Sequence, residues 1–229
     1  MVRVINVGLG VRGRRWVEWA KDAGADVVGL VDANPDTLSE QGEALGFPED
    51  KRFTSVAEAV KALQPQAAVV CAPNHVHPIL ARECLEQGLH LLIEKPMAED
   101  IETAKGIVEL AEDRGLQFTV AQQYRYRKPE QALKKLLEMN AIGDLTGGMV
   151  QFYRWRPTKG MTLPILLNQA IHHFDTMRAV IGSTPVSCMA DLWNPDWNDC
   201  DGPTVVEATF RWENGARIHY SGSYVARGK

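Results

Sequence analysis

The sequence lacks any apolar run long enough to cross a lipid bilayer. A transmembrane helix needs about 20 consecutive apolar residues, and no run in this chain of 229 residues approaches that length. The first residues lead directly into a strand-like segment, without the charged and apolar regions of a signal peptide. We therefore expect a soluble, cytoplasmic protein with no membrane partner.

An excess of basic charge is also missing. The chain has 25 basic and 29 acidic residues, which give a formal net charge of -4, and it contains no block rich in lysine or arginine. Proteins that bind nucleic acids carry such a block or a basic patch. Nucleic acid is therefore not an expected partner.

Cysteine is scarce, with 4 residues and no CxxC pair. A chain of this length buries enough apolar surface to fold without disulfide bonds. Reduced and mostly buried thiols are the expected state of Cys71, Cys84, Cys188 and Cys200.

The first half of the chain has the pattern of a parallel sheet covered by helices. Apolar runs of strand length alternate with helical stretches, as in repeated βαβ units. Ser55 and Glu58 form a capping box, and Gly24, Gly88 and Gly115 stand where helices are expected to end. The expected strands cover residues 2–7, 27–31, 67–71, 90–94 and 118–121.

The pattern changes near residue 122, which predicts one domain over residues 1–122 and a second over residues 123–229. Asn214-Gly215 predicts a tight hairpin in the second domain. The longer strand-like segments there predict a largely antiparallel, open-faced sheet with a helix on one side, an α+β domain. These strands cover residues 147–153, 186–192, 204–212 and 217–224, and helices are expected over 129–139 and near 171–181.

The most informative motif is Gly8-Leu9-Gly10-Val11-Arg12-Gly13, which follows the first strand and opens the first helix. Gly8 allows a tight turn, Gly10 lets a pyrophosphate approach the backbone, and Gly13 allows close packing of helix and strand. The free N–H groups of the helix N-terminus attract phosphate. The motif predicts a dinucleotide-binding Rossmann fold, a doubly wound α/β domain.

Asp32 ends the second strand, at the spacing expected for an acid that binds the adenosine ribose. A carboxylate at this position repels the 2′-phosphate of NADP, although Arg12, Arg14 and Arg15 lie near the loop. The sequence therefore favours NAD as the cofactor over NADP. The alternative is an ordinary turn followed by a solvated aspartate.

Polar residues follow three further strands, at the edge of the sheet where ligands bind. They lie in the segments Pro73-Asn74-His75-Val76-His77, Glu94-Lys95-Pro96 and Gln122-Gln123-Tyr124-Arg125. A lysine beside a bound nicotinamide would exchange a proton with a hydroxyl group or polarise a carbonyl. Lys95 is therefore the first catalytic candidate, and the alternative is an ion pair between Glu94 and Lys95 in a turn.

The glycine motif, Pro73 to His77, Glu94-Lys95-Pro96 and Ile171-His172-His173-Phe174-Asp175 together resemble the Gfo/Idh/MocA family of NAD(P)-dependent sugar and cyclitol oxidoreductases. The resemblance covers nearly the whole chain. It implies that Lys95 lies near the nicotinamide and that the Lys95-Pro96 bond is cis. It also implies that the residues around the cofactor are Gly8, Leu9, Gly10, Val11, Arg12, Gly13, Asp32, Pro73, Asn74, His77, Glu94, Lys95 and Gln123.

The same resemblance implies that His172 exchanges the proton of the substrate hydroxyl, with Asp175 one helical turn later. Relatives often have an aspartate where this chain has Asn168, and an amide cannot accept a proton as a carboxylate does. This departure puts the aspartate-assisted proton relay in doubt, while Asn168 would still orient a hydroxyl group. Arg125 and the aromatic Trp155 are the further candidates for substrate contact.

A metal site is not expected. His75-x-His77 and His172-His173 would be the candidate ligands, but no cysteine or carboxylate cluster completes either pair, and hydride transfer needs no metal. Trp193 and Trp197 lie in a polar loop that would edge a sugar site or pack at an interface.

Three functions follow from these observations. The first is an NAD-dependent oxidoreductase that acts on a sugar, sugar derivative or cyclitol; the second is a glycoside hydrolase that retains NAD; the third is a dinucleotide-binding fragment without catalysis. The resemblance also implies a homodimer or homotetramer. Because relatives continue beyond the last expected strand, the second domain is expected to be incomplete.

Overall fold

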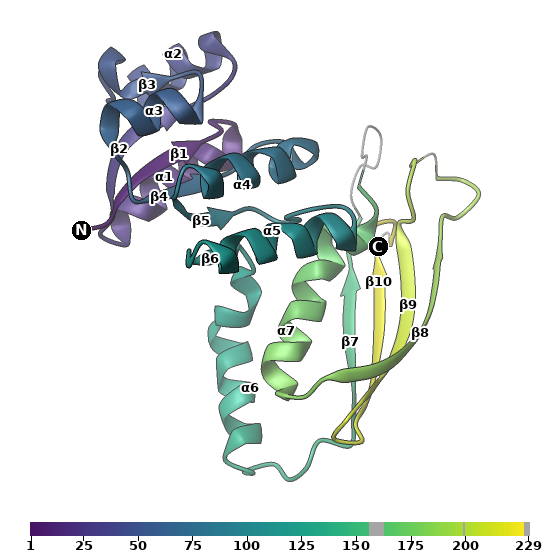
Figure 1. Ribbon diagram of the computed structural model, residues 1–229. Helices are drawn as coiled ribbons and strands as arrows, with labels where there is room; N and C mark the ends of the chain where they lie inside the picture. Colours follow the sequence, from purple (N-terminus) through teal and green to yellow (C-terminus); the bar gives the residue numbers. More distant parts are fainter. Residues whose placement is uncertain (156–162, 199, 227–229) are drawn as a thin grey trace. The chain divides into compact units, whose positions relative to one another are not determined.

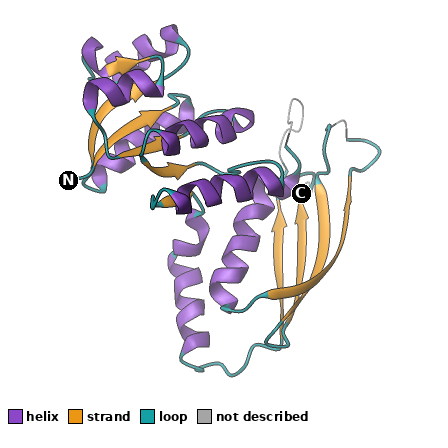
Figure 2. Cartoon of the chain, viewed as in Figure 1, coloured by secondary structure: helices purple, strands orange, loops and turns teal. Residues whose placement is uncertain are grey.

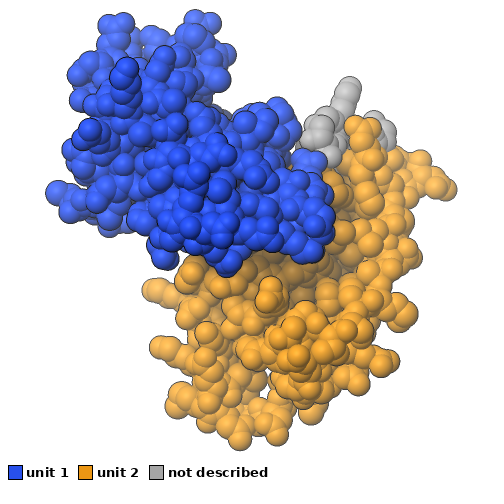
Figure 3. Space-filling model, viewed as in Figure 1, with its two compact units in different colours: residues 1–121 blue, residues 122–229 orange. Residues whose placement is uncertain are grey.

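The computed structural model describes residues 1–155, 163–198 and 200–226 (Figure 1). The chain divides into two compact units, Met1–Ala121 and Gln122–Lys229 (Figure 3).

The first unit is built on a parallel sheet of 6 strands in the order β3-β2-β1-β4-β5-β6. This is the order of the doubly wound dinucleotide-binding fold, in which the chain reverses its winding direction beside β1 and leaves a ligand crevice there. The parallel sheet predicted from the sequence is confirmed, and the short strand β3 is an addition to it. The strands are β1 (Arg3–Val7), β2 (Asp26–Val31), β3 (Arg52–Phe53), β4 (Ala67–Val70), β5 (His90–Ile93) and β6 (Phe118–Val120).

Helices cover both faces of this sheet, because the strands are apolar on both sides. One cluster of buried side chains packs α3, α4 and α5 on the sheet, and a separate cluster packs α1 and α2. The Ser55 hydroxyl accepts a hydrogen bond from the Glu58 amide at the start of α3, as predicted. The helical segments are α1 (Val11–Asp22), α2 (Pro35–Ala44), η1 (Glu49–Lys51), α3 (Val56–Leu63), η2 (Asn74–Val76), α4 (His77–Glu86) and α5 (Ile101–Asp113).

The second unit is a sheet of 4 strands in the order β7-β10-β9-β8, with helices on one face (Figure 2). The β8–β9 and β9–β10 pairs are antiparallel, and the β7–β10 pair is parallel. Gly215, with a φ of +89°, turns the hairpin between β9 and β10, as predicted. The elements are η3 (Gln123–Tyr126), α6 (Lys128–Glu138), β7 (Gly147–Tyr153), η4 (Leu166–Ala170), α7 (Ile171–Ile181), β8 (Pro185–Trp193), β9 (Val205–Trp212) and β10 (Arg217–Ser223).

The thiols are less uniformly buried than the sequence suggests. Cys84 and Cys200 are buried and Cys71 is partly buried, but Cys188 is exposed. The reason is that β8 lies at the edge of its sheet. Burial, together with the negative charge of Glu83, raises the pKa of the Cys84 thiol to about 12.

In the part of the chain that the structure describes, each helix is too short or too polar to cross a membrane.

Candidate active site

The loop between β1 and α1 requires glycine at two positions for steric reasons. Gly8 has a φ of +91°, and a Cβ atom there would lie 2.3 Å from the carbonyl oxygen of Cys71. A Cβ atom on Gly13 would lie 2.0 Å from the carbonyl oxygen of Gly8. A Cβ atom on Gly10, by contrast, would meet no atom within 4 Å. The backbone at Gly10 is therefore open to an approaching ligand, while Gly8 and Gly13 hold the loop against the sheet.

The N-terminus of α1 has the features of an anion site. Gly10 is the N-cap residue, so no side chain caps the helix, and its first turn contains no acidic residue. The first amides of a helix need an acceptor from outside the helix, and a phosphate group supplies one. These residues therefore fit the pyrophosphate of a dinucleotide. Val11 and Arg12 are exposed beside them, whereas the Leu9 side chain is buried in the core.

Asp32 is held in place at the end of β2 by two backbone amides. Its Oδ2 accepts a hydrogen bond from the Leu9 amide at 2.8 Å, and its Oδ1 accepts one from the Asn34 amide at 2.9 Å. Each carboxylate oxygen retains a lone pair for a ribose hydroxyl group.

A cavity of about 490 Å³ opens beside Asp32. Its walls are mainly apolar and include Pro73, Val76, Ile79 and Leu80. An apolar space next to a carboxylate suits a nucleoside, because the base is buried while the ribose hydroxyls reach the acid.

Glu94 follows β5 and is buried, with a relative exposure of 8%. Its Oε1 accepts a hydrogen bond from the Trp16 indole at 2.9 Å and lies 3.7 Å from the Arg12 guanidinium. Its Oε2 accepts a weaker hydrogen bond from the Lys95 amide at 3.3 Å. The Glu94 side chain thus connects α1 to the loop that carries Lys95, and its expected place in the cofactor site stays a prediction. The Lys95-Pro96 bond is cis, as expected.

His77 also has a structural position. It is fully buried, and its Nδ1 and Nε2 lie 2.7 Å and 2.9 Å from the carbonyl oxygens of Pro96 and Ala72. Both ring nitrogens therefore contact the backbone of neighbouring loops, and the expectation that His77 lines the nicotinamide half of the cofactor stays a prediction. Pro73 and Asn74, which precede it, are more accessible.

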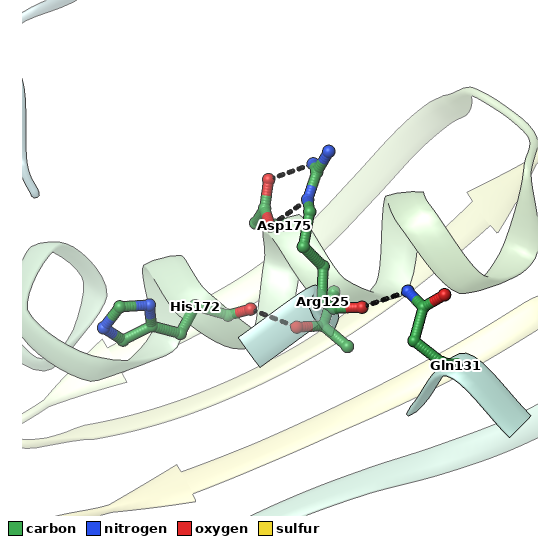
Figure 4. Close-up of polar contacts among 5 residues, drawn as sticks. Arg125, Gln131, His172 and Asp175 are labelled. Atoms are coloured by element: carbon green, nitrogen blue, oxygen red, sulfur yellow. Dashed lines mark hydrogen bonds and ion pairs between the residues drawn. The ribbon is translucent and has the colours of Figure 1, made fainter. Parts of the chain in front are cut away.

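In the second unit, Arg125 of η3 and Asp175 of α7 form a two-point ion pair (Figure 4). The Arg125 Nε donates to Asp175 Oδ2 at 2.7 Å, and the Arg125 backbone carbonyl accepts a hydrogen bond from Gln131. The ion pair, chiefly through the hydrogen bond, raises the pKa of Arg125. Both residues were predicted to contact substrate, and the structure pairs them with each other, so together they connect η3 to α7.

His172 lies in the first turn of α7 and has a relative exposure of only 4%. Its backbone carbonyl accepts a hydrogen bond from the Thr176 hydroxyl, and its ring stacks on Tyr124 of η3. Asn168 lies one turn earlier, within the π-helical turn η4. Such turns are frequent at functional sites, because the wider turn changes the direction of the side chains.

Two further predicted residues are exposed. Gln123 begins η3 with an exposed side chain. Trp155, with a relative exposure of 52%, follows β7 and pairs with Val225 through an isolated bridge.

Two family models match the chain. The first, described as an oxidoreductase family with an NAD-binding Rossmann fold, matches residues 2–122 and therefore more than half of the chain. The chain belongs to the Gfo/Idh/MocA oxidoreductase family. The second model, the C-terminal domain of this family, matches residues 131–229.

Relatives of this Gfo/Idh/MocA protein are longer than the chain. An uncharacterized protein, y4oX, of Sinorhizobium fredii is 29% identical, and the match covers 96% of this chain and 65% of the relative. An inositol 2-dehydrogenase of Corynebacterium glutamicum is 27% identical, with 81% of this chain and 56% of the relative covered. The chain thus spans less than two thirds of the length of these relatives.

Among solved structures, an oxidoreductase from Agrobacterium radiobacter in complex with NAD+, L-tartaric acid and magnesium has the same fold. The TM-score is 0.90 at 21% sequence identity, and the match covers 99% of this chain and 68% of that one.

The C-terminal unit of this family member also contains an apolar groove of about 520 Å³ between α6, α7 and β7. Its lining is mainly aliphatic, and polar side chains also contribute to it: Tyr124, Arg127, Glu130, Gln151, His173 and Thr176. Among the described residues, moreover, no three His, Cys, Asp or Glu side chains are grouped as metal ligands.

Sequence reasoning missed three residues that support the predicted ones. Trp16 binds Glu94, Tyr124 stacks on His172, and Gln169 donates to the Tyr124 hydroxyl. Tyr124 stands between two residues that were selected, Gln123 and Arg125, but its role depends on a partner in α7. No local pattern reveals such a contact.

His173 differs from its neighbour, because it faces the sheet and hydrogen-bonds the Tyr220 hydroxyl at 2.9 Å. Burial, reinforced by the positive charge of Arg127, lowers the pKa of His173 to about 4 from an ordinary value of 6.5. Below about pH 6.5 the His173 imidazole is protonated in the unfolded chain, whereas in the folded chain it stays neutral down to about pH 4. We therefore expect His173 to reduce the free energy of unfolding as the pH falls through this window.

The His173→Gln variant should show a shallower loss of stability than the original chain between pH 6.5 and 4, as measured by urea unfolding at several pH values. Equal slopes for the two proteins would show that His173 takes up its proton equally in the folded and unfolded states.

Proposed function

We propose that this chain binds NAD(H) and belongs to an enzyme that oxidises a hydroxyl group of a sugar, sugar derivative or cyclitol, or reduces the matching ketone. The observation that carries the proposal is the uncapped helix N-terminus at Gly10, followed by the fixed carboxylate of Asp32. The similarity to an inositol 2-dehydrogenase supports the substrate class. Bound NAD would accept or supply the hydride.

We propose separate roles in the reaction for the other residues of the site. Lys95 and His172 are the groups that we propose to exchange the hydroxyl proton, since hydride transfer from a secondary alcohol requires a base. Asn168 would hold a neighbouring hydroxyl through its amide. Arg125 and Asp175 neutralise each other, and their proposed role is to hold η3 against α7.

The preference for NAD over NADP rests on two carboxylates. Asp32 would accept hydrogen bonds from the ribose hydroxyls and repel a 2′-phosphate. Arg12, one of the arginines near the loop, forms an ion pair with Glu94 at 3.7 Å. Its positive charge is therefore partly neutralised within the protein.

We also propose a homodimer or homotetramer that uses the face of the second sheet opposite α6 and α7. Met149, Tyr153 and Met189 are exposed large side chains on these strands. Exposed apolar side chains of this size are typical of protein interfaces. The molecular mass in solution, measured by light scattering, tests this assembly.

The cofactor proposal is tested by titrating the purified chain with NADH and with NADPH while following nicotinamide fluorescence. We expect NADH to bind about 10- to 100-fold more tightly, because charge-assisted hydrogen bonds to the ribose contribute about 1.5–3 kcal/mol. Asp32→Ser should remove most of this preference. The matched control is Asp36→Ser, which removes an exposed carboxylate from the first turn of α2.

An unchanged NADH-to-NADPH ratio in Asp32→Ser would contradict the role of Asp32, and the absence of binding would contradict the cofactor proposal. A subsequent screen of polyols separates the remaining functions. Net formation of NADH indicates a dehydrogenase, whereas glycoside cleavage without net NADH indicates hydrolysis with a retained cofactor. Binding without either reaction indicates a non-catalytic fragment.

A further inference from the structure

Tyr124 lies in the middle of a three-part stack within the second unit. Its ring centroid is 4.4 Å from that of His172, and the two planes are within 13° of parallel. The Arg127 guanidinium carbon lies 3.2 Å from the ring centroid of Tyr124. Face-to-face contact of this kind favours one orientation of the imidazole plane.

The Tyr124 ring is itself held at its far end. Its hydroxyl accepts a hydrogen bond at 3.0 Å from the side-chain amide of Gln169, which is 8% exposed. Gln169 belongs to η4, the π-helical turn that leads directly into α7 and His172. The ring that packs on His172 is therefore tied to the same segment that carries His172.

The ion pair between Arg125 and Asp175 strengthens this arrangement. The ion pair joins η3, which carries Tyr124, to α7, which carries His172. Its arginine is the next residue after Tyr124 in the sequence, and its aspartate is three residues after His172. The relative positions of Tyr124 and His172 are thus determined by a ring stack, a hydrogen bond and an ion pair. Such a set of contacts exceeds what packing of a single buried ring requires.

From this geometry we infer that Tyr124 is a positioning residue for His172, which sets the plane of the imidazole and therefore the direction in which its nitrogen exchanges a proton. The inference rests on the proposed function, because only a reacting histidine needs a defined direction. A displacement of about 1 Å in a reacting group costs about 100-fold in rate. The purely structural alternative is that Tyr124 fills space beside α7.

The neighbouring histidine is an internal comparison. The His173 ring lies 5.7 Å from Tyr124 at 50°, a tilted contact, and it hydrogen-bonds the Tyr220 hydroxyl. The near-parallel stack is made with His172. Tyr124 should therefore influence the signals of His172 much more than those of His173.

The test has a spectroscopic arm that does not depend on activity. The chain contains 6 histidines, and the imidazole signals of His172 are identified in NMR spectra of the full chain by their loss in His172→Gln. In the original protein these signals should lie upfield, because the Tyr124 ring covers the imidazole face. Tyr124→Phe should retain the upfield shift, and Tyr124→Leu should lose it. The matched control, Tyr126→Leu, changes an exposed tyrosine of the same turn and should leave it unchanged.

The kinetic arm uses the best polyol found with the original chain. Tyr124→Leu should lower kcat by about 10- to 100-fold with little change in the KM for NAD, while Tyr124→Phe and Tyr126→Leu stay within about threefold of the original. If Tyr124 had only a structural role, Tyr124→Leu would lower Tm but would not lower kcat selectively while leaving the KM for NAD unchanged. Thermal unfolding identifies any variant that fails to fold. If Tyr124→Leu does not fold, the test rests on the NMR spectra of the original protein and of Tyr124→Phe.

Two results would overturn the inference: His172 signals without an upfield shift in the original protein, or a kcat of Tyr124→Leu equal to that of the control. If the original chain turns over no polyol, the proposed function fails, and the spectroscopic arm decides by itself whether Tyr124 orients the imidazole.

Discussion

Gly13→Ala is expected to lower the Tm of the first unit by about 5–15 °C, since a side chain forced into a packed site costs about 1–3 kcal/mol. The new Cβ atom would lie 2.0 Å from the Gly8 carbonyl oxygen, well inside van der Waals contact. Either α1 moves away from β1 or the loop is distorted. Both changes displace the amides at the helix N-terminus, so NADH affinity should fall at least about tenfold. Calorimetry and fluorescence titration measure the two effects.

Gly10→Ala is the matched control, with the same substitution three residues earlier in the same loop. A Cβ atom there meets nothing within 4 Å, and the φ of −61° suits any residue. Its Tm should stay within about 2 °C of the original value. NADH affinity should nevertheless fall, because the methyl group occupies the space that the pyrophosphate approaches. If both variants lost equal stability, the steric account of the loop would be wrong.

Lys95→Met is expected to lower kcat by about 100- to 10,000-fold, the range for removal of a general acid or base. Methionine preserves most of the apolar stem and removes the ammonium group, so the fold and NADH binding should be largely retained. His172→Gln should have an effect in the same range. The measurement is initial-rate formation of NADH at saturating polyol, together with a fluorescence titration of NADH.

Lys105→Met is the matched control for this prediction. Lys105 lies on α5 and pairs at 2.9 Å with Glu102, and both side chains are largely exposed. Surface ion pairs contribute little to stability, so kcat and Tm should be unchanged. A kcat for Lys95→Met above about a tenth of the original value would remove Lys95 from the proton step.

The sequence could predict the glycine loop because the requirement there is local. Gly8, Gly10 and Gly13 act through the sterics of a single turn, and the spacing to Asp32 follows from one βαβ unit. The sequence did not reveal the contacts of side chains whose partners are distant. His77 and Glu94 were placed around the cofactor, but their polar atoms bind the protein itself.

By itself, the sequence determined the alternation of strands and helices, the turn at the glycine loop and the hairpin at Asn214-Gly215. These features depend on backbone conformation and on apolar periodicity over a few residues. Only the tertiary structure decided which polar groups pair: Arg125 with Asp175, 50 residues apart, and Trp16 with Glu94, 78 residues apart. The physical reason is that hydrogen bonds and ring stacking act over a few ångströms, and packing of the whole unit determines which distant residues come that close.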